Sequence, residues 1–132
     1  MANSKTTLTA SNIKYLLVIY DLCKASGETR CVRIAEVLGL SKPSVHTMIG
    51  TLKDMELVHK DLYGTVTFTE TGKELAEQYT KYFEQISSWF EAILPNSADI
   101  RPAVCAVMSE MSAELLEEMC RKITEQEIND VS

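Results

Sequence analysis

Apolar residues recur through most of this chain at the three- and four-residue spacing of an amphipathic helix, which predicts a mainly helical protein. Turn-forming and helix-capping residues separate the periodic stretches. The first helix is expected to be capped by Thr9 or Ser11 and to reach about Ala25. The later helices expected from the pattern cover residues 32–38, 41–53, 73–94, 101–108 and 112–122.

The stretch from Arg30 to Phe68 carries the clearest pattern. A short helix runs into a Gly39-Leu40-Ser41 turn, and Ser41 is well placed to cap the helix that follows. Pro43 suits the first turn of that helix, where a backbone N–H has no intrahelical partner. The apolar stripe of this helix consists of Val45, Met48, Ile49 and Leu52. Its opposite face is small and polar, with Ser44, His46, Thr47, Gly50, Thr51 and Lys53.

A hairpin is expected directly after this helix. Residues 57–60 and 65–68 are rich in strand-forming residues, and Asp61–Gly64 joins them as a loop. A short strand at Thr29–Cys31 is expected to pair with the hairpin. Helix, tight turn, capped helix and hairpin in this order are typical of a winged helix-turn-helix. We therefore expect a mainly α fold with a small β wing, and double-stranded DNA as its partner.

The second half of the chain predicts a helical dimerisation domain. Thr71 to Glu74 match the capping-box pattern and would start a long linking helix over residues 73–94. The apolar stripe of this helix is wider than one small domain covers, so it needs a second layer of helices or a partner chain. We expect a DNA-binding domain at 1–72, a dimerisation domain at 73–132, and a homodimer. The homodimer is expected to form through surplus apolar residues of the long helix and the last helix, namely Trp89, Phe90, Ile93, Leu115, Leu116 and Met119.

The last expected helix begins at Ser112, which serves as its cap. Its buried face is expected to consist of Leu115, Leu116, Met119 and Ile123. Residues 124–132 are polar and are expected to form a frayed tail.

The net charge of −6 is unevenly distributed along the chain. Residues 1–72 hold eight Lys or Arg and seven Asp or Glu, a net charge of +1. Residues 73–132 hold five Lys or Arg and twelve Asp or Glu, a net charge of −7. The acidity thus belongs to the second half. The near-neutral first half predicts modest electrostatic affinity for DNA, which a dimer would compensate by doubling the contact.

Composition excludes several other classes of protein. The cysteines Cys23, Cys31, Cys105 and Cys120 form no C-x-x-C pair and are expected to be reduced, buried thiols. No apolar run approaches the ~20 residues of a membrane span. Residues 1–10 lack the apolar segment of a signal peptide, so we expect a cytoplasmic protein. No nucleophile pattern, carboxylate pair or phosphate loop is visible, so no enzyme is expected.

The chain resembles the diphtheria-toxin-repressor family, which includes iron-dependent repressors and manganese transport regulators. The matching residues are Tyr15-Leu16, Ile19-Tyr20, Arg33 to Glu36, Leu38, Ser41, Pro43, Ser44-Val45, Leu57-Val58, Thr69 to Gly72 and Leu75-Ala76. The match runs from Ile13 to Lys122. The chain stops where larger members add a third, SH3-like domain, so it resembles the short two-domain type. The resemblance implies a homodimeric transcription regulator, a repressor, in which Fe²⁺ or Mn²⁺ sets the spacing of two DNA-binding domains.

The resemblance also places residues on the DNA. Ser41, Pro43, Ser44 and Thr47 fall at family positions that face the groove or the phosphates. Lys42, His46, Gly50, Thr51 and Lys53 extend that face, and Lys60 and Tyr63 lie on the wing, where they suit the backbone or the minor groove. No Arg lies on the recognition helix, so base choice is expected to depend on Thr47, His46 and DNA shape.

The family's metal-ligand positions carry other residues in this chain. The replacements are Lys14, Phe83, Ser87, Met108 and Ser109, while Cys105 matches one ligand position. Fe²⁺ and Mn²⁺ prefer carboxylate and imidazole ligands, and an ammonium group repels a cation. We therefore expect no metal ligands and no cofactor. Two alternatives stay open: a winged-helix protein-interaction module, and a thiol or soft-metal sensor that uses Cys105.

Overall fold

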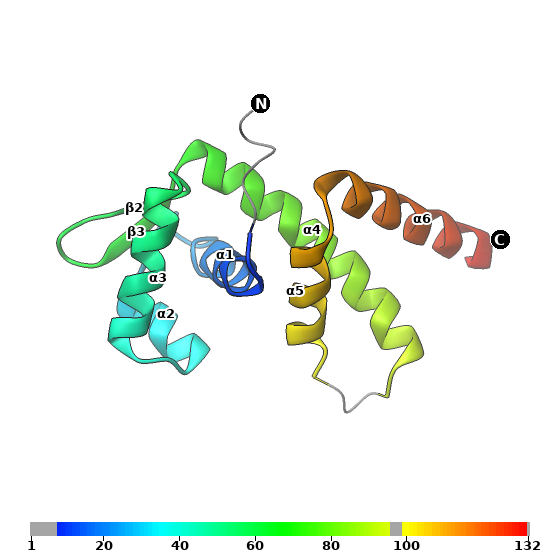
Figure 1. Ribbon diagram of the computed structural model, residues 1–132, viewed down its shortest axis with the longest axis horizontal. Helices are drawn as coiled ribbons and strands as arrows, with labels where there is room; N and C mark the ends of the chain where they lie inside the picture. The colour runs from blue at the N-terminus through cyan, green and yellow to red at the C-terminus, as the bar shows by residue number, and fades with distance from the viewer. Residues whose placement is uncertain (1–7, 96–98, 132) are drawn as a thin grey trace. The chain divides into compact units, whose positions relative to one another are not determined.

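The computed structural model describes residues 8–95 and 99–131, with side-chain surroundings up to residue 126, and it is mainly helical with one small sheet (Figure 1). This confirms the fold class predicted from the sequence. The elements are α1 (Ala10–Leu22), β1 (Thr29–Arg30), α2 (Cys31–Leu38), α3 (Lys42–Asp54), β2 (Val58–Lys60), β3 (Thr65–Phe68), α4 (Glu70–Ile93), α5 (Arg101–Glu110) and α6 (Ala113–Val131).

The chain divides into two compact units. One consists of residues 14–78 and contains the sheet; the other joins the described residues up to Ile13 with those from Tyr79 onward. We call them the winged unit and the helical unit. The domain division expected from the sequence, 1–72 and 73–132, stays a prediction.

The sheet of the winged unit is antiparallel, with strand order β1-β3-β2. Thr29 lies opposite Val66, and Val58 lies opposite Phe68. The short strand before α2 therefore pairs with the wing, as the sequence predicted. Because β1 and β2 flank β3, the start of α2 is tied to the hairpin.

The core of the winged unit follows the helical periodicity of its sequence. α2 and α3 each place one apolar stripe inward, whereas α1 is buried at five consecutive residues, 15–19. Full burial of a Leu, Ile or Val side chain contributes about 1.5–3 kcal/mol. The largest fully buried side chains of this unit are Leu16, Ile19, Ile34, Val45, Ile49, Leu52, Val58 and Val66.

The turn between α2 and α3 forms as its residues predict. Gly39 has a left-handed backbone (φ 67°), and the amide of Leu40 donates to the carbonyl of Ala35 at 3.1 Å. This closes the end of α2 and directs the chain into α3. The helix boundaries there agree with the prediction to within a residue.

The start of α4 corrects the sequence prediction. The capping residue is Thr69 rather than Thr71, since the amide of Gly72 donates to the Thr69 hydroxyl oxygen at 2.9 Å. The same hydroxyl donates to the carbonyl of Glu56 at 2.7 Å. Gly72 lies so close to the wing base that a Cβ there would meet the carbonyl oxygen of Leu57 at 1.8 Å. The helix therefore begins at Glu70, packed against backbone that leads into β2.

The helical unit has its own core. Its buried side chains include Tyr82, Ile86, Val104, Cys105, Met108, Leu116, Cys120 and Ile123. The Tyr82 hydroxyl donates to a Glu117 carboxylate oxygen at 2.6 Å, which links α4 to α6. Ser112 caps α6 as predicted, accepting from the amide of Leu115 at 3.1 Å.

Two predictions for the end of the chain are wrong. α6 continues to Val131, whereas residues 124–132 were expected to be a frayed tail. Good helix formers such as Glu and Gln extend the helix without an apolar stripe. Leu115 was expected to be buried but is 55% exposed, because the buried stripe of α6 runs along Leu116, Cys120 and Ile123.

Candidate nucleic-acid interface

The outer face of α3 is small, polar and exposed. Residues Ser41, Lys42, Pro43, Ser44, His46, Thr47, Thr51 and Lys53 are all exposed, and Gly50 is half-buried. The inner face holds Val45, Ile49 and Leu52, each fully buried. The residues predicted for the helical part of a DNA-binding surface are thus brought together on one helix face.

The N-terminus of α3 is fixed by serine hydroxyls. The Ser41 hydroxyl oxygen accepts from the amide of Ser44 at 3.3 Å and also donates to the Ser44 hydroxyl at 2.9 Å. These bonds fix both serines at the N-terminus of α3. Unpaired backbone amides and the helix dipole at a helix N-terminus favour an anion such as a phosphate oxygen.

Gly50 lies on the exposed side of α3 without a packing requirement. A Cβ added there would meet no atom of the protein within 4 Å. Glycine destabilises a helix interior by about 1 kcal/mol relative to alanine. Because Gly50 has no side chain, another molecule can approach this face of α3 closely. A side chain at residue 50 would fill that space.

The wing tip is organised by Asp61. Its carboxylate accepts from the amides of Tyr63 at 2.8 Å and Thr65 at 2.9 Å. These bonds lower the pKa of Asp61 from its ordinary value, and the bond from the Thr65 amide has the largest effect. Gly64 takes a left-handed backbone (φ 85°), which closes the turn.

Two residues at the wing tip are strongly exposed. Tyr63, which is predicted from the sequence to contact DNA, is 78% exposed, and Leu62 beside it is 96% exposed. Leu62 was missed from the sequence; an apolar residue at a polar hairpin tip was the available signal. Arg30 was also missed. Its guanidinium donates to the carbonyl of Tyr63 at 2.8 Å and so ties β1 to the wing tip.

Several cations near this surface are free to contact phosphates. Among the residues that the structure describes, Lys42, Lys53 and Lys60 have no carboxylate within ion-pairing distance. Arg33, by contrast, pairs with Glu36 at 3.3 Å. Lys60 is half-buried at the end of β2, directly before the loop of the wing.

The residues at the family's metal-ligand positions do not fit a hard divalent cation. Within the described part of the chain, no three His, Cys, Asp or Glu side chains are grouped to hold a metal ion. The Arg101 guanidinium lies over the Phe83 ring at 5.4 Å, adding positive charge beside that position. Met108 is 1% exposed, and the Ser109 hydroxyl donates to the carbonyl of Ala106 at 2.8 Å. A thioether and an engaged hydroxyl are poor ligands for Fe²⁺ or Mn²⁺.

The cysteines form no disulfides among themselves, as predicted. Cys31, Cys105 and Cys120 are buried, while Cys23 is half-buried. Burial raises the pKa of Cys31, Cys120 and Cys23, which keeps these thiols protonated and weakly nucleophilic at neutral pH. In the described residues no helix is long and apolar enough to span a membrane.

The winged unit contains the helices α1, α2 and α3 and a three-stranded sheet that includes the hairpin. A tight turn joins α2 to α3, and Ser41 caps α3. This arrangement is a winged helix-turn-helix. Residues 7–66 match the family model described as the iron dependent repressor, N-terminal DNA binding domain. This segment is therefore similar to a DNA-binding domain of the iron-dependent-repressor type.

Over 61 residues the chain is 36% identical to an uncharacterized protein of Methanocaldococcus jannaschii; this covers 44% of the chain and 13% of that protein. The chain thus spans a small part of this relative.

Solved structures share the fold at low sequence identity. The manganese regulator SloR aligns with a TM-score of 0.69 at 24% identity, over 91% of this chain and 55% of that chain. IdeR of T. acidophilum aligns with a TM-score of 0.63 at 16% identity, over 90% of this chain and 55% of that chain. A hypothetical protein of Sulfolobus solfataricus aligns with a TM-score of 0.60 at 20% identity, over 89% of this chain and 91% of that chain. These likenesses establish the fold, which extends beyond the DNA-binding domain.

Proposed function

We propose that the protein is a transcription regulator, a repressor, that binds operator DNA as a homodimer. The observation that carries the proposal is the exposed polar face of α3, held by the Ser41 cap within a domain of the iron-dependent-repressor type. This helix would enter the major groove, and the wing would contact the backbone or the minor groove.

The DNA-binding proposal is tested by changing the two side chains expected to reach bases. An operator is first selected from random duplexes. His46→Ala and Thr47→Ala are each expected to weaken binding to it by roughly 1–3 kcal/mol per lost good base contact. Ser88→Ala, an exposed serine in the helical unit, is the matched control. Unchanged operator affinity in both α3 variants contradicts the proposed orientation.

The winged-helix protein-interaction module remains the alternative, because the net charge of the first 72 residues is only +1. Salt distinguishes the two functions. A DNA binder releases counterions, so the logarithm of its affinity falls linearly with the logarithm of salt concentration. Lys42→Gln and Lys53→Gln should reduce that slope. Absence of salt-dependent binding to any duplex would favour the interaction module.

We further propose that operator binding needs no Fe²⁺ or Mn²⁺. This proposal is supported by the residues at the family's metal-ligand positions. Lys14, Phe83 and Met108 replace ligands there. A lost site offers an effector no differential affinity for two states. Operator affinity in chelator is expected to equal that in added Mn²⁺ or Fe²⁺. Loss of binding in chelator with recovery in either metal contradicts this.

The sensor alternative based on Cys105 has little structural support, since this thiol is 1% exposed. Reaction with an oxidant or a soft metal requires access to the sulfur. Cys105→Ser is expected to leave operator affinity, and its response to peroxide and Zn²⁺, as in the wild type.

A further inference from the structure

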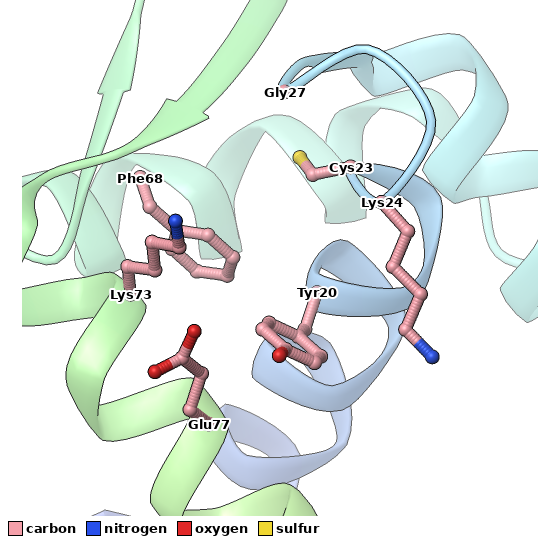
Figure 2. Close-up of a pocket in the computed structure, with 7 residues that line it drawn as sticks. All are labelled: Tyr20, Cys23, Lys24, Gly27, Phe68, Lys73 and Glu77. Atoms are coloured by element: carbon pink, nitrogen blue, oxygen red, sulfur yellow. The ribbon is translucent and has the colours of Figure 1, made fainter.

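A pocket lies inside the winged unit, away from the outer face of α3. It has a volume of about 410 Å³, within the range of roughly 300–1,000 Å³ typical of small-ligand sites. Its lining comes from the end of α1 and the turn that follows it, from β3 and from the first turns of α4. Figure 2 shows the rings of Tyr20 and Phe68, the Cys23 thiol and the Glu77 carboxylate around an open space.

The apolar part of this pocket is aromatic. The Tyr20 and Phe68 ring centroids are 6.5 Å apart, and the rings are tilted by 46°. Both side chains are half-buried, so each leaves part of its ring open to the pocket. The two rings contact each other at this separation, and aromatic rings favour offset or tilted packing against a further ring. A ligand with a planar apolar body fits this surface.

The polar part carries one unpaired charge of each sign. Lys73 and Glu77 lie one turn apart on α4, and no ion pair or side-chain hydrogen bond joins either to another described residue. A lysine that precedes a glutamate by four residues is the less favourable order for pairing on a helix. Lys24, the other cation of the lining, is already engaged: it pairs with Asp21 at 3.6 Å and lies 5.7 Å from the Tyr20 ring centroid.

We propose that this pocket binds a small aromatic zwitterion, a free α-amino acid with an aromatic side chain. The ligand ring packs against the open sides of Tyr20 and Phe68, its ammonium group bonds the Glu77 carboxylate, and its carboxylate bonds the Lys73 ammonium. Taking about 30 Å³ for each water-sized group, the pocket has room for one such molecule. Charge-assisted hydrogen bonds at both ends then select the zwitterion over molecules that carry one charge.

The test measures binding of three probes to the full chain without DNA. L-phenylalanine, phenethylamine and 3-phenylpropionate share the ring but carry both charges, the ammonium alone or the carboxylate alone. In titrations followed by NMR into the millimolar range, L-phenylalanine is expected to bind about tenfold more tightly than either single-charge probe. Equal binding of all three, or no binding of L-phenylalanine, overturns the proposal.

Variants locate the binding to this pocket. Glu77→Gln and Lys73→Gln are each expected to weaken L-phenylalanine binding about tenfold, and Phe68→Leu at least as much. The matched controls are Glu74→Gln and Lys81→Gln on the same helix, which are exposed and outside the pocket lining. Because Phe68 also supports the wing, a thermal melt accompanies that variant, and the two charge variants decide the outcome if it unfolds. Binding that survives both charge changes overturns the assignment.

Any effect of this ligand on operator affinity rests on the proposed function, whereas binding itself does not. The pocket borders β3 and the start of α4, so an occupant contacts the base of the wing. Operator affinity is therefore measured separately, with and without saturating L-phenylalanine. Ligand binding without DNA binding would refute the proposed function and leave the site intact.

Discussion

At the scale of single residues, the two helical glycines of the winged unit have opposite surroundings. Gly50 faces open space, whereas Gly72 faces the backbone of Leu57. A methyl group at residue 50 therefore meets only solvent or a bound partner. A methyl group at residue 72 collides with a carbonyl oxygen that cannot rotate away.

Gly50→Ala is expected to separate stability from binding. The free energy of unfolding should rise by up to about 1 kcal/mol, because alanine is the better helix former. Operator affinity should fall, because the added methyl group holds the helix away from the groove. Urea denaturation and a DNA titration on the same preparation measure both quantities. A variant that gains stability and keeps full operator affinity would remove Gly50 from the proposed interface.

Helix caps set by nearby residues were predictable from the sequence. Ser41 and Ser112 cap their helices as predicted, because a cap depends on residues a few positions away. The sequence predicted a cap at Thr71, because Thr71 to Glu74 match a capping box. The hydroxyl of Thr69 is held by the carbonyl of Glu56, thirteen residues earlier, and such a contact leaves no trace in local spacing.

At the scale of elements, the wing is a short hairpin whose tip depends on one carboxylate. Asp61 holds the amides of Tyr63 and Thr65, and Arg30 holds the carbonyl of Tyr63. The exposed Leu62 and Tyr63 are thus carried on an ordered loop. If the wing contacts DNA as proposed, ordering before binding reduces the loss of conformational entropy on binding.

The Asp61 bonds predict a specific dependence of stability on pH. Hydrogen bonds to the charged form lower the pKa of Asp61 below its ordinary value of 3.8. Its contribution to stability is therefore present above that value and is lost as pH falls through the folded-state pKa. The difference in unfolding free energy between wild type and Asp61→Ala should be constant from pH 7 to about 5 and shrink below about 4. Urea denaturation across this range measures it.

Asp61→Asn is the matched control for this prediction, since an amide oxygen accepts hydrogen bonds without titrating in this range. Its stability relative to Asp61→Ala should show no loss that follows the acid titration. A difference between wild type and Asp61→Ala that stays constant down to pH 2.5 would contradict the role given to the carboxylate.

At the scale of the whole molecule, helices and hairpin were predictable because each is encoded by short-range periodicity and turn residues. The pocket of the winged unit was not predictable. Tyr20 lies more than forty residues before Phe68 and Glu77, the three residues come from three different elements, and each looks like an ordinary core or surface position. The exposure of Leu115 was missed for a related reason, since the rotation of α6 about its axis depends on contacts with other helices.

The proposed homodimer is expected to depend on apolar side chains that the helical unit leaves exposed. Trp89 is 44% exposed, Ile93 61% and Leu115 55%. The double variant Trp89→Ser and Leu115→Ser should shift the protein to a monomer in light scattering at tens of micromolar. Operator affinity should fall with it, because a two-fold dimer places two recognition helices on one duplex.

Glu91→Gln and Lys122→Gln, exposed polar changes in the same unit, serve as controls for this variant. A wild-type protein that is already monomeric at these concentrations contradicts the dimer proposal. A double variant that stays dimeric moves the interface to other residues of the helical unit.

The close approach of Gly72 to the Leu57 carbonyl has a consequence for how this protein can evolve. No lineage that keeps this backbone can replace glycine at residue 72, whatever its regulator controls or whether it binds DNA at all. Glycine at residue 50 is under no such structural constraint and can mutate freely once the surface it faces loses its partner. Among descendants of this gene, glycine at residue 72 therefore indicates only that the fold is kept. Loss or retention of glycine at residue 50 indicates whether α3 still binds a partner.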